Sequence, residues 1–463
     1  MSSYPPLSGV ILAAGKGTRM KSETPKALFR VCGLPMAELV GRAMSQAGVD
    51  HTVMVVGHQA DRVKSELGYQ YAYALQVEQK GTGHAALMAQ SALEGRTGAV
   101  LIAPGDAPLL DGESLKKLAC QHWESGSKAT LATCVLADPH GYGRVIRDAA
   151  GKVAQIVEEK DCTPEQRAIR EVNAGIYCFD ISRLFEILPL LKNSNAQGEY
   201  YLTDAIAEIA ANGTVETVEF DPLTATGVND RWQLAEAEAQ LRRRILRSHA
   251  LNGVTITDPA STYIGLDVAI EADVEILPMT TLAGKTRVAS GTTIGPSSCV
   301  IDSQIGPNCR ILISHVQGAI MGEGSKCGPF ANLRPGAVLG EGSKVGNFVE
   351  VKKATLGPGA AASHLTYIGD ASIGANTNLG AGTITCNYDG FSKHRTEIGS
   401  DAFIGSNSTL VAPITIGDGA IVAAGSVITS DVPADALALG RSRQENKEQW
   451  APPWRERKRR PTE

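Results

Sequence analysis

A glycine-rich segment near the N-terminus has the residue types that bind phosphate. The chain reads LAAGKGTRM from residue 12 to residue 20, and PK follows at positions 25 and 26. Gly15 and Gly17 let the backbone approach phosphates closely, while Arg19 and Lys26 bring positive charge to the same place. The spacing matches neither the Walker loop nor the dinucleotide fingerprint. The glycines alone would also fit an ordinary strand-to-helix turn.

One carboxylate stands where a metal ion would be needed beside bound phosphates. Asp106 follows the apolar run at 99–103, after Pro104 and Gly105. If that run is a strand of a parallel sheet, its carboxyl end faces the ligand, and a carboxylate there suits magnesium. On its own, however, Asp106 is better explained as a helix N-cap or a turn residue.

The C-terminal half holds one histidine in a suggestive place. His364 lies in the segment AASHLTYIG, residues 361–369, inside a break in a repeating pattern. Imidazole removes protons near neutral pH, and as a general base it contributes about 10²–10⁴ in rate. A lone histidine in a loop is more often a bystander, so the residue alone does not establish an active site.

Apolar runs and amphipathic segments alternate over residues 9 to about 228. Runs at 9–12, 52–56 and 99–103 predict strands, and segments 35–46 and 113–122 predict helices. Near-continuous apolar strands between helices indicate a mostly parallel sheet covered on both faces. We therefore expect an α/β domain over 1–229 that binds its ligand at the carboxyl ends of the strands.

A single helix is predicted to follow this domain, over 230–253. Apolar residues at 234, 237, 241 and 245 recur at helical spacing. Asn229 or Asp230 can cap its start, and Gly253 can end it.

Aliphatic residues recur every six positions through most of the C-terminal half. They are Ile264, Ile270, Ile276, Leu282, Val288, Ile294 and Val300, then Leu333, Leu339, Val345 and Val351, and then Ile398, Ile404, Leu410, Ile416, Val422 and Ile428. This period indicates the hexapeptide repeat of a parallel β-helix over 254–441. The aliphatic residues fill its column, with about nine coils and a length on the order of 40 Å. The period fails at 352–367 and 385–397, where we expect loops that carry function.

The bulk composition excludes several classes of protein. The chain has 463 residues and a formal net charge of −5, which gives no reason to expect nucleic acid or a membrane surface as a partner. Its nine cysteines are scattered without C-x-x-C spacing, so neither a zinc site nor a disulfide framework is expected. No signal peptide and no run of ~20 apolar residues is found, which predicts a cytoplasmic protein.

Taken together, these motifs resemble a known family. G-x-G-T-R-M followed by P-K resembles the signature of sugar-nucleotide pyrophosphorylases, and residues 9 to about 445 resemble the bifunctional bacterial enzymes of UDP-N-acetylglucosamine synthesis. The resemblance implies a Rossmann-like α/β nucleotidyltransferase with a mostly parallel sheet, followed by a left-handed parallel β-helix of hexapeptide repeats. It also implies two reactions. Acetyl-CoA acetylates glucosamine 1-phosphate, and UTP with Mg²⁺ then uridylylates N-acetylglucosamine 1-phosphate and releases pyrophosphate.

The resemblance assigns residues to the uridyltransferase site. Those that match nucleotide contacts are Leu12, Ala13, Ala14, Gly15, Lys26, Gln76, Gly81, Thr82, Pro104, Gly105 and Asp106. Those that match sugar contacts are Gly143, Glu158 and Asn173, and the magnesium pair is Asp106 with Asn229. Arg19 and Lys26 would support in-line attack of the sugar phosphate on the α-phosphorus. This family more often has Tyr or Ala at position 104, so Pro104 is expected to stiffen the loop.

A second set of residues is assigned to the acetyltransferase site. His364 matches the catalytic base, which would remove a proton from the sugar ammonium. The matches to sugar-phosphate contacts are Arg334, Lys352, Tyr367 and Asn378, and the two cations suit a phosphate dianion. The matches to acetyl-CoA contacts are Ala381, Asn387, Tyr388, Ser406, Ala424 and Arg441. The family usually has Asn where Ser363 precedes the histidine, which leaves the oxyanion contact open.

The resemblance further implies a homotrimer with acetyltransferase sites between neighbouring β-helices. The tail, 442–463, carries a basic cluster, Arg455, Arg457, Lys458, Arg459 and Arg460. We expect this tail to be flexible, and contact with coenzyme A phosphates is the alternative.

Two other functions compete with this interpretation. A single-activity pyrophosphorylase with a β-helix for assembly or regulation should lack His364, Asn387, Tyr388 and Arg441, yet all are present. A non-enzymatic regulatory subunit should have a degraded glycine-rich loop or metal pair, and both are intact.

Overall fold

The chain is organised in two compact units. The computed structural model describes residues 5–459, and its units are Met1–Arg244 and Ile245–Glu463. The division falls inside helix α9 (Arg231–Leu251), which is the helix predicted over 230–253. The domain limits proposed from the sequence stay predictions.

The first unit is built on a mixed sheet in the order β11-β7-β10-β6-β1-β4-β5. Its strands are β1 Leu7–Ala13, β4 His51–Val56, β5 Ala72–Leu75, β6 Ala99–Pro104, β7 Ala129–Val135, β10 Glu171–Asp180 and β11 Val215–Glu219. All neighbours pair in parallel except β10, which runs antiparallel to β6 and β7. The predicted mostly parallel sheet is therefore confirmed, with strands at 9–12, 52–56 and 99–103 inside β1, β4 and β6.

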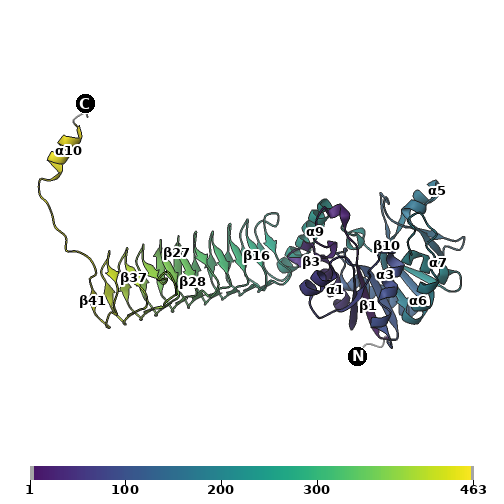
Figure 1. The fold of residues 1–463 in the computed structure, drawn as a ribbon, viewed down its shortest axis with the longest axis horizontal. Coiled ribbons are helices and arrows are strands. Elements are labelled where there is room, and N and C mark those ends of the chain that lie inside the picture. The colour runs from purple at the N-terminus through teal and green to yellow at the C-terminus, as the bar shows by residue number, and fades with distance from the viewer. Residues whose placement is uncertain (1–4, 460–463) are drawn as a thin grey trace. The chain divides into compact units, whose positions relative to one another are not determined.

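Smaller elements complete this unit (Figure 1). They are β2 Arg30–Val31, β3 Leu34–Pro35, β8 Arg144–Arg147, β9 Val153–Val157, α1 Met36–Gln46, α2 Ala60–Leu67, α3 Thr82–Met88, α4 Gly112–Ser125, α5 Pro164–Arg167, α6 Ile181–Ile187, α7 Leu202–Ala210 and α8 Pro222–Ala225. Short 3₁₀ helices are η1 Thr18–Met20, η2 Lys26–Leu28, η3 Ser91–Leu93, η4 Glu159–Asp161 and η5 Leu188–Leu190. The helices predicted at 35–46 and 113–122 are α1 and α4.

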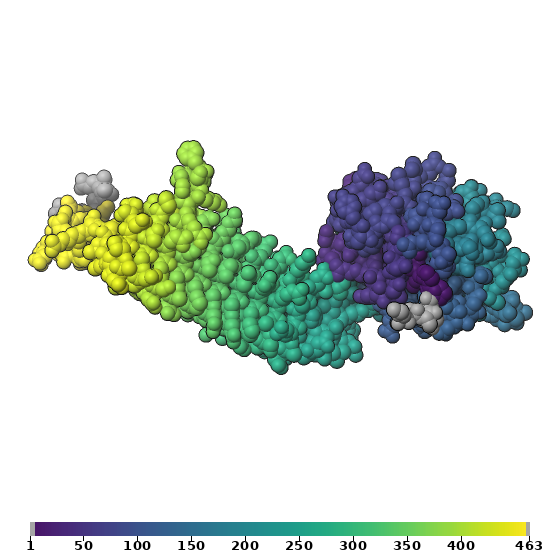
Figure 2. Space-filling model, turned by 90° about the horizontal axis from the view of Figure 1, so that it is seen from below, coloured from purple at the N-terminus to yellow at the C-terminus, as the bar shows by residue number. Residues whose placement is uncertain are grey.

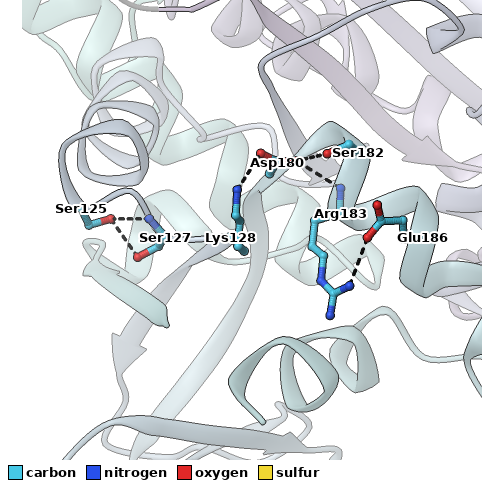
Figure 3. Close-up of polar contacts among 7 residues, drawn as sticks. All are labelled: Ser125, Ser127, Lys128, Asp180, Ser182, Arg183 and Glu186. Carbon is cyan, nitrogen blue, oxygen red and sulfur yellow. Dashed lines mark hydrogen bonds and ion pairs between the residues drawn. The ribbon is translucent and has the colours of Figure 1, made fainter. Parts of the chain in front are cut away.

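Both faces of the sheet are buried, as predicted for near-continuous apolar strands. Successive residues of β1 enter opposite cores: Ile11 packs in the cluster that includes α1 and α4, and Val10 in the cluster with α6 and α7. At the far end of β10, Asp180 begins α6 (Figure 3). Its carboxylate accepts hydrogen bonds from the Arg183 N–H at 3.1 Å and the Ser182 hydroxyl at 2.6 Å. The bond from the Arg183 N–H satisfies one backbone donor at the N-terminus of the helix.

The second unit winds three parallel sheets into the predicted left-handed β-helix (Figure 1). In the described residues the first sheet has 11 strands: β12 Thr255–Ile256, β15 Glu275–Ile276, β18 Thr293–Ile294, β21 Arg310–Ile311, β24 Lys326–Cys327, β27 Lys344–Asn347, β30 Ala361–His364, β33 Asn378–Leu379, β36 Phe403–Ile404, β39 Ile421–Val422 and β41 Leu437–Ala438. The second has 10: β13 Tyr263–Ile264, β16 Thr281–Ala283, β19 Cys299–Ile301, β22 His315–Gln317, β25 Asn332–Leu333, β28 Glu350–Lys352, β31 Tyr367–Gly369, β34 Ile384–Cys386, β37 Thr409–Val411 and β40 Val427–Ile428. The third has 9: β14 Ala269–Ile270, β17 Arg287–Val288, β20 Gln304–Ile305, β23 Ile320–Met321, β26 Val338–Leu339, β29 Thr355–Leu356, β32 Ala371–Ile373, β35 Thr396–Ile398 and β38 Ile414–Ile416.

The predicted loop at 352–367 is wrong, because the coils continue through it. Strands β28 to β31 pair in register with the coils on both sides. The six-residue rule misses them for two reasons: the step from Val351 to Leu356 is one residue short, and the next inward position is Ala362, a residue too small to mark a core. His364 consequently ends strand β30 and does not lie in a loop.

The second predicted loop, at 385–397, is confirmed within narrower limits. It leaves the column after β34 and returns at β35, with a single antiparallel bridge between Tyr388 and Lys393. Figure 2 shows a projection of the corresponding colour standing out from the β-helix surface. In the tail, α10 (Ala451–Arg459) is a largely exposed helix, and its flexibility stays a prediction. Arg460 and the residues after it lie outside the described part of the chain.

Candidate functional sites

A cavity of about 500 Å³ opens where β1 and β6 end. Its walls include nearly every residue that the sequence assigned to the uridyltransferase site: Leu12, Ala13, Ala14, Gly15, Arg19, Lys26, Gln76, Gly81, Thr82, Pro104, Gly105, Asp106, Glu158, Asn173 and Asn229. Gly143 does not line the cavity itself, but its carbonyl accepts a hydrogen bond of 2.8 Å from the N–H of Asn173, which does. The structure thus brings together residues from positions 12 to 229 at the expected edge of the sheet.

The glycine-rich loop is shaped by close contacts that only glycine permits. Gly17 has φ +63°, and a Cβ there would stand 2.7 Å from the Cβ of Lys26. The 3₁₀ turn that follows ends in the fully buried Met20. Arg231 holds this turn from α9: its Nε donates to the Met20 carbonyl at 3.2 Å, and its guanidinium lies over the Phe29 ring. The loop is therefore fixed before any ligand arrives.

Two cations and two oxygen-bearing side chains meet at the floor of the cavity. Lys26 forms an ion pair with Asp106, and its ammonium donates to the Asn229 amide oxygen at 3.0 Å. Arg19 donates to the same oxygen at 2.8 Å. The Asn229 amide is oriented by its own donation to the Gly227 carbonyl at 3.3 Å. The Asp106 and Asn229 oxygens thus converge on one cationic group.

This donor set fits a magnesium ion that arrives with phosphate oxygens. One carboxylate and one amide oxygen are ligands that Mg²⁺ accepts, and it usually completes its shell with waters and substrate phosphates. Among the described residues, no group of three or more His, Cys, Asp and Glu side chains is gathered to hold a metal by itself. The geometry therefore fits a metal shared with a nucleotide better than an all-protein site.

Buried polar side chains line the opposite end of the cavity. The Asn173 amide donates to the Tyr177 hydroxyl at 2.7 Å, and its oxygen accepts from the Gly175 N–H at 3.1 Å. The Thr203 hydroxyl donates to Glu158 at 3.1 Å, and burial raises the pKa of that carboxyl. Sequence reasoning missed Tyr177, Gly175 and Thr203, which also line the cavity. The pairing of β10 with β7 shifts register between Asn173 and Tyr177, and Gly175 lies within this irregular segment. No sequence motif predicts the irregularity.

Two further predicted residues are held by backbone contacts. Gln76 donates to the Gly81 carbonyl at 3.1 Å, and the Thr82 hydroxyl accepts from the Leu202 N–H at 3.0 Å. A Cβ on Gly81 would stand 2.6 Å from the Tyr200 carbonyl oxygen. These bonds tie the strand-to-helix connection before α3 to α7, so this wall of the cavity is rigid.

The predicted base on the β-helix is exposed and oriented. His364 ends β30 directly above Asn347 of β27, and the Asn347 amide oxygen lies 2.5 Å from His364 Nδ1. Because an amide oxygen can only accept, Nδ1 carries the proton and Nε2 is left with its lone pair. Asn347 was missed from the sequence, because its contact depends on a register that the broken period conceals.

Two cationic side chains lie at the ends of strands of the second sheet, next to the first sheet, which carries His364. Arg334 and Lys352 occupy equivalent positions of neighbouring coils, just after the paired residues Leu333 and Val351. Contact with Lys393 of the projecting loop, followed by repulsion from Arg334, lowers the pKa of Lys352. Like charges held this close favour an anion between them. Lys393 was also missed from the sequence, since nothing in the loop shows that it folds back toward Lys352.

The residues assigned to acetyl-CoA lie mostly along one edge of the column. Ala381, Ser406 and Ala424 follow the paired strands β33, β36 and β39, so they occupy successive coils beyond His364. Arg441 continues this row, with its Cδ 4.0 Å from the position a Gly425 Cβ would take. Asn378 stands at the foot of the row, next to Phe403 of the following coil.

Asn387 and Tyr388 stand at the base of the projecting loop. Asn387 is buried and donates to Asp370 at 2.5 Å, whereas Tyr388 is exposed and donates to the Gly390 carbonyl at 2.6 Å. Tyr367 pairs with Glu350 and Ile384 within the second sheet of the β-helix. The second predicted set thus extends along successive coils on two neighbouring sheets, from Arg334 after β25 to Arg441 after β41.

The fold and its two sites define a bifunctional transferase: a nucleotidyltransferase domain joined to a hexapeptide-repeat domain. Residues 9–169 match the family described as the MobA-like NTP transferase domain, and residues 395–430 match the hexapeptide repeat of succinyl-transferase. The chain belongs to the bifunctional GlmU family. This membership confirms the predicted resemblance and the bifunctional transferase role in UDP-N-acetylglucosamine synthesis.

Full-length relatives support the family assignment. "Bifunctional protein GlmU" of Geobacillus sp. (strain WCH70) is 49% identical over 443 residues, covering 95% of this chain and 96% of the relative. Its namesake in Carboxydothermus hydrogenoformans is 50% identical over 446 residues, covering 96% and 100%. That of Streptococcus thermophilus (strain LMD-9) is 48% identical over 457 residues, covering 97% and 98%. None of the described helices is long and apolar enough to span a bilayer.

Proposed function

We propose that the cavity at the ends of β1 and β6 transfers a uridylyl group from UTP to N-acetylglucosamine 1-phosphate. The observation that carries this proposal is the convergence of the predicted phosphate, metal and sugar residues on one cavity. The backbone N–H groups around Gly15 and Gly17 bind the triphosphate. At the other end, the fixed Asn173 amide and the Glu158 carboxyl hold the sugar.

Asp106 and Asn229 would hold Mg²⁺ together with the nucleotide phosphates. When bound, the ion would supply positive charge that stabilises the phosphates in the transition state. Arg19 and Lys26 bind the oxygens around the α-phosphorus, so that the sugar 1-phosphate oxygen attacks in line and pyrophosphate leaves. Lys26 lies against Asp106 in the free protein. Binding of the metal therefore requires the Lys26 ammonium to turn toward the phosphates.

The edge of the β-helix at His364 is the second proposed site, and it transfers an acetyl group from acetyl-CoA to glucosamine 1-phosphate. Arg334, Lys352 and Lys393 bind the sugar phosphate. The row of Ala381, Ser406 and Ala424 offers small side chains along successive coils, where extended coenzyme A can lie. The thioester then reaches His364 at the foot of the row.

His364 acts as the general base of this reaction. Its Nε2 takes a proton from the sugar ammonium, and the freed amine attacks the thioester carbonyl carbon. The C–S bond then breaks, the coenzyme A thiolate takes up a proton, and the acetamide remains. The bond from Nδ1 to Asn347 keeps the imidazole in the tautomer that this step needs. The residue before His364 is Ser363 and not Asn. No oxyanion contact is therefore assigned to that position.

A homotrimer completes the proposed assembly, and an apolar ladder supports it. Ile313, Phe330, Phe348 and Leu365 stack on successive coils, and all four have positive φ. Bulky residues rarely adopt that conformation, which costs roughly 1–2 kcal/mol each. The Phe330 and Phe348 rings stack at 5.4 Å and are more than half exposed in the single chain. Strain and exposure together favour contact with a second copy beside His364. The cytoplasmic location remains part of this proposal.

One experiment tests both reactions. Purified protein receives glucosamine 1-phosphate, acetyl-CoA, UTP and Mg²⁺, and free thiol and pyrophosphate are followed separately. We expect thiol release without UTP, and pyrophosphate release only after acetylation. Pyrophosphate formed from supplied N-acetylglucosamine 1-phosphate, with no thiol from glucosamine 1-phosphate, would instead identify a single-activity enzyme with a structural β-helix.

A further inference from the structure

The projecting loop between β34 and β35 is closed by a contact between a histidine and a carboxylate. His394 Nε2 lies 2.6 Å from the Asp389 carboxylate. The same carboxylate accepts hydrogen bonds of 2.7 Å from the N–H groups of Phe391 and Ser392. The Asp389 side chain thus binds both the tip of the loop and the segment that returns to β35.

The two arms of this loop are joined by a β-bridge, and both carry residues of interest for the proposed acetyltransferase site. The returning strand holds Lys393, next to His394, and its ammonium contacts Lys352. The outgoing strand holds Tyr388, which bridges to Lys393. The His394 N–H closes the base of the loop by donating to the Asn387 carbonyl at 2.8 Å. Any change in the closure of the loop therefore moves Lys393 relative to Lys352.

The tip of the loop is held by few bonds. Phe391 is 95% exposed. Besides the bonds to the Asp389 carboxylate, the Asp389 N–H donates to the Ser392 carbonyl at 3.2 Å and the Tyr388 hydroxyl donates to the Gly390 carbonyl at 2.6 Å. Holding Lys393 against Lys352 also works against the repulsion of two like charges. The closure must therefore come from bonds such as that between Asp389 and His394.

We propose that Asp389 and His394 form a latch that positions Lys393 for the phosphate of glucosamine 1-phosphate. This inference rests on the proposed acetyltransferase function and adds two positioning residues to it. Neither residue needs to touch the substrate. Loss of the latch lets the loop open, which weakens binding of the sugar phosphate and leaves the chemistry at His364 unchanged.

Hydrogen bonds from Ser392, His394 and Phe391 together lower the pKa of Asp389, so this carboxylate stays charged through the neutral range. The other charged groups of the described loop and its supports are Lys393, Arg395, Asp370 and Glu397; Asn387 binds Asp370 and Arg395 binds Glu397. The Asp389 carboxylate is therefore the anionic half of the latch.

Kinetics of the whole enzyme with two variants test the latch. His394→Phe keeps a flat ring without the charge, and Asp389→Asn keeps an oxygen for the Phe391 and Ser392 N–H groups. For acetyl transfer at neutral pH, each should raise KM for glucosamine 1-phosphate by about two- to fivefold, the range of an exposed charged contact, with kcat unchanged. The double variant should equal either single variant.

Glu397→Gln is the matched control, since it breaks the neighbouring exposed ion pair with Arg395 outside the loop tip. It should leave KM for glucosamine 1-phosphate unchanged. Hydrogen–deuterium exchange gives a second readout, in which His394→Phe should expose the Phe391, Ser392 and His394 amides. An unchanged KM in both latch variants together with unchanged exchange would overturn the latch. If the wild-type protein transfers no acetyl group, the proposed function fails, and the exchange experiment alone decides whether the latch exists.

Discussion

At the scale of single residues, the proposed uridyltransferase cavity depends on one carboxylate. Asp106 is the acidic side chain of the described cavity wall that pairs with Lys26, whose ammonium also donates to Asn229. Asp106→Asn should reduce uridylyl transfer by at least about 10²-fold, comparable to the loss of one preorganised charge-stabilising group. Acetyl transfer should stay unchanged. The measurement is pyrophosphate release from UTP and N-acetylglucosamine 1-phosphate at saturating Mg²⁺.

Asp111→Asn provides a matched control for that variant. Asp111 caps α4 through its bond of 2.8 Å to the Ser114 N–H and lies outside the cavity wall. An asparagine can keep the cap, so both activities should persist. Full uridylyl transfer by Asp106→Asn would remove Asp106 from the proposed metal site.

A buried histidine outside both sites sets the acid stability of the first unit. Burial lowers the pKa of His122 from 6.5 to about 4. Between pH 6.5 and pH 4, His122 therefore binds a proton in the unfolded chain but not in the folded chain. The contribution of neutral His122 to the free energy of unfolding is full above pH 6.5 and falls as pH drops toward 4. The loss by pH 4 should reach about 3 kcal/mol, at 1.36 kcal/mol per pKa unit.

Urea unfolding followed by circular dichroism at 222 nm measures this effect, because most described helices lie in the first unit. His122→Gln can keep a bond to the Thr130 hydroxyl, which lies 3.1 Å from His122. Its unfolding midpoint should depend less on pH between 6.5 and 4. The same pH dependence in the variant and the wild type would assign acid sensitivity to other groups.

The sequence predicted the residues of the first cavity better than those of the second site. Strand ends in a parallel sheet bring Gly15, Asp106 and their neighbours to one edge, whatever the details of packing. Asn347 and Lys393 could not be found this way, because their positions depend on coil register and on how a loop folds back. Tyr177 and Thr203 were missed for a similar reason: they orient other residues and belong to no motif.

At the scale of elements, the acetyltransferase site depends on the close approach of β27 and β30. A Cβ on Gly346 would stand 2.0 Å from the Ser363 carbonyl oxygen. Gly346→Ala must therefore push apart the strands that carry Asn347 and His364. We expect acetyl transfer to fall by about tenfold or more, because a misplacement of about 1 Å can cost 10²-fold in rate. Uridylyl transfer should be retained.

Gly342→Ala is the control in the same coil. It also introduces a methyl group, at φ +63° but with open space around it, so it should cost about 1 kcal/mol of stability without moving the strands. Acetyl transfer by this variant should match the wild type. Equal loss of acetyl transfer in both variants would indicate general destabilisation and not displacement of His364.

The strands of the β-helix show which coils the six-residue pattern could predict and which it could not. Steps of six between aliphatic residues located most coils, including those at 264–300 and 398–428. Steps of five, such as Val300 to Ile305, and small inward residues, such as Ala362, hid the coils between them. Both changes keep the column continuous, because backbone pairing between coils tolerates a shorter turn. A strict period therefore underestimates the continuity of a β-helix.

At the scale of the whole molecule, the chain has two compact units, and each carries one of the proposed sites. Damage to one activity therefore need not reach the other. The apolar ladder extends this argument to the assembly. Phe348 is 57% exposed and Leu365 62% exposed in the single chain, one coil apart and next to His364. If copies of the chain pack along this ladder, a charge placed there must separate them, since burying an unpaired charge is costly.

Phe348→Asp should therefore convert the proposed trimer to monomers and remove most acetyl transfer while sparing uridylyl transfer. Sedimentation velocity distinguishes a particle of three times 48.7 kDa from the single chain. Tyr69→Asp is the control, because Tyr69 is a fully exposed aromatic residue of the first unit and should leave both mass and activities unchanged. A Phe348→Asp protein that remains trimeric would move the interface away from the ladder. A wild-type protein that is monomeric and transfers acetyl groups would show that each β-helix holds a complete site.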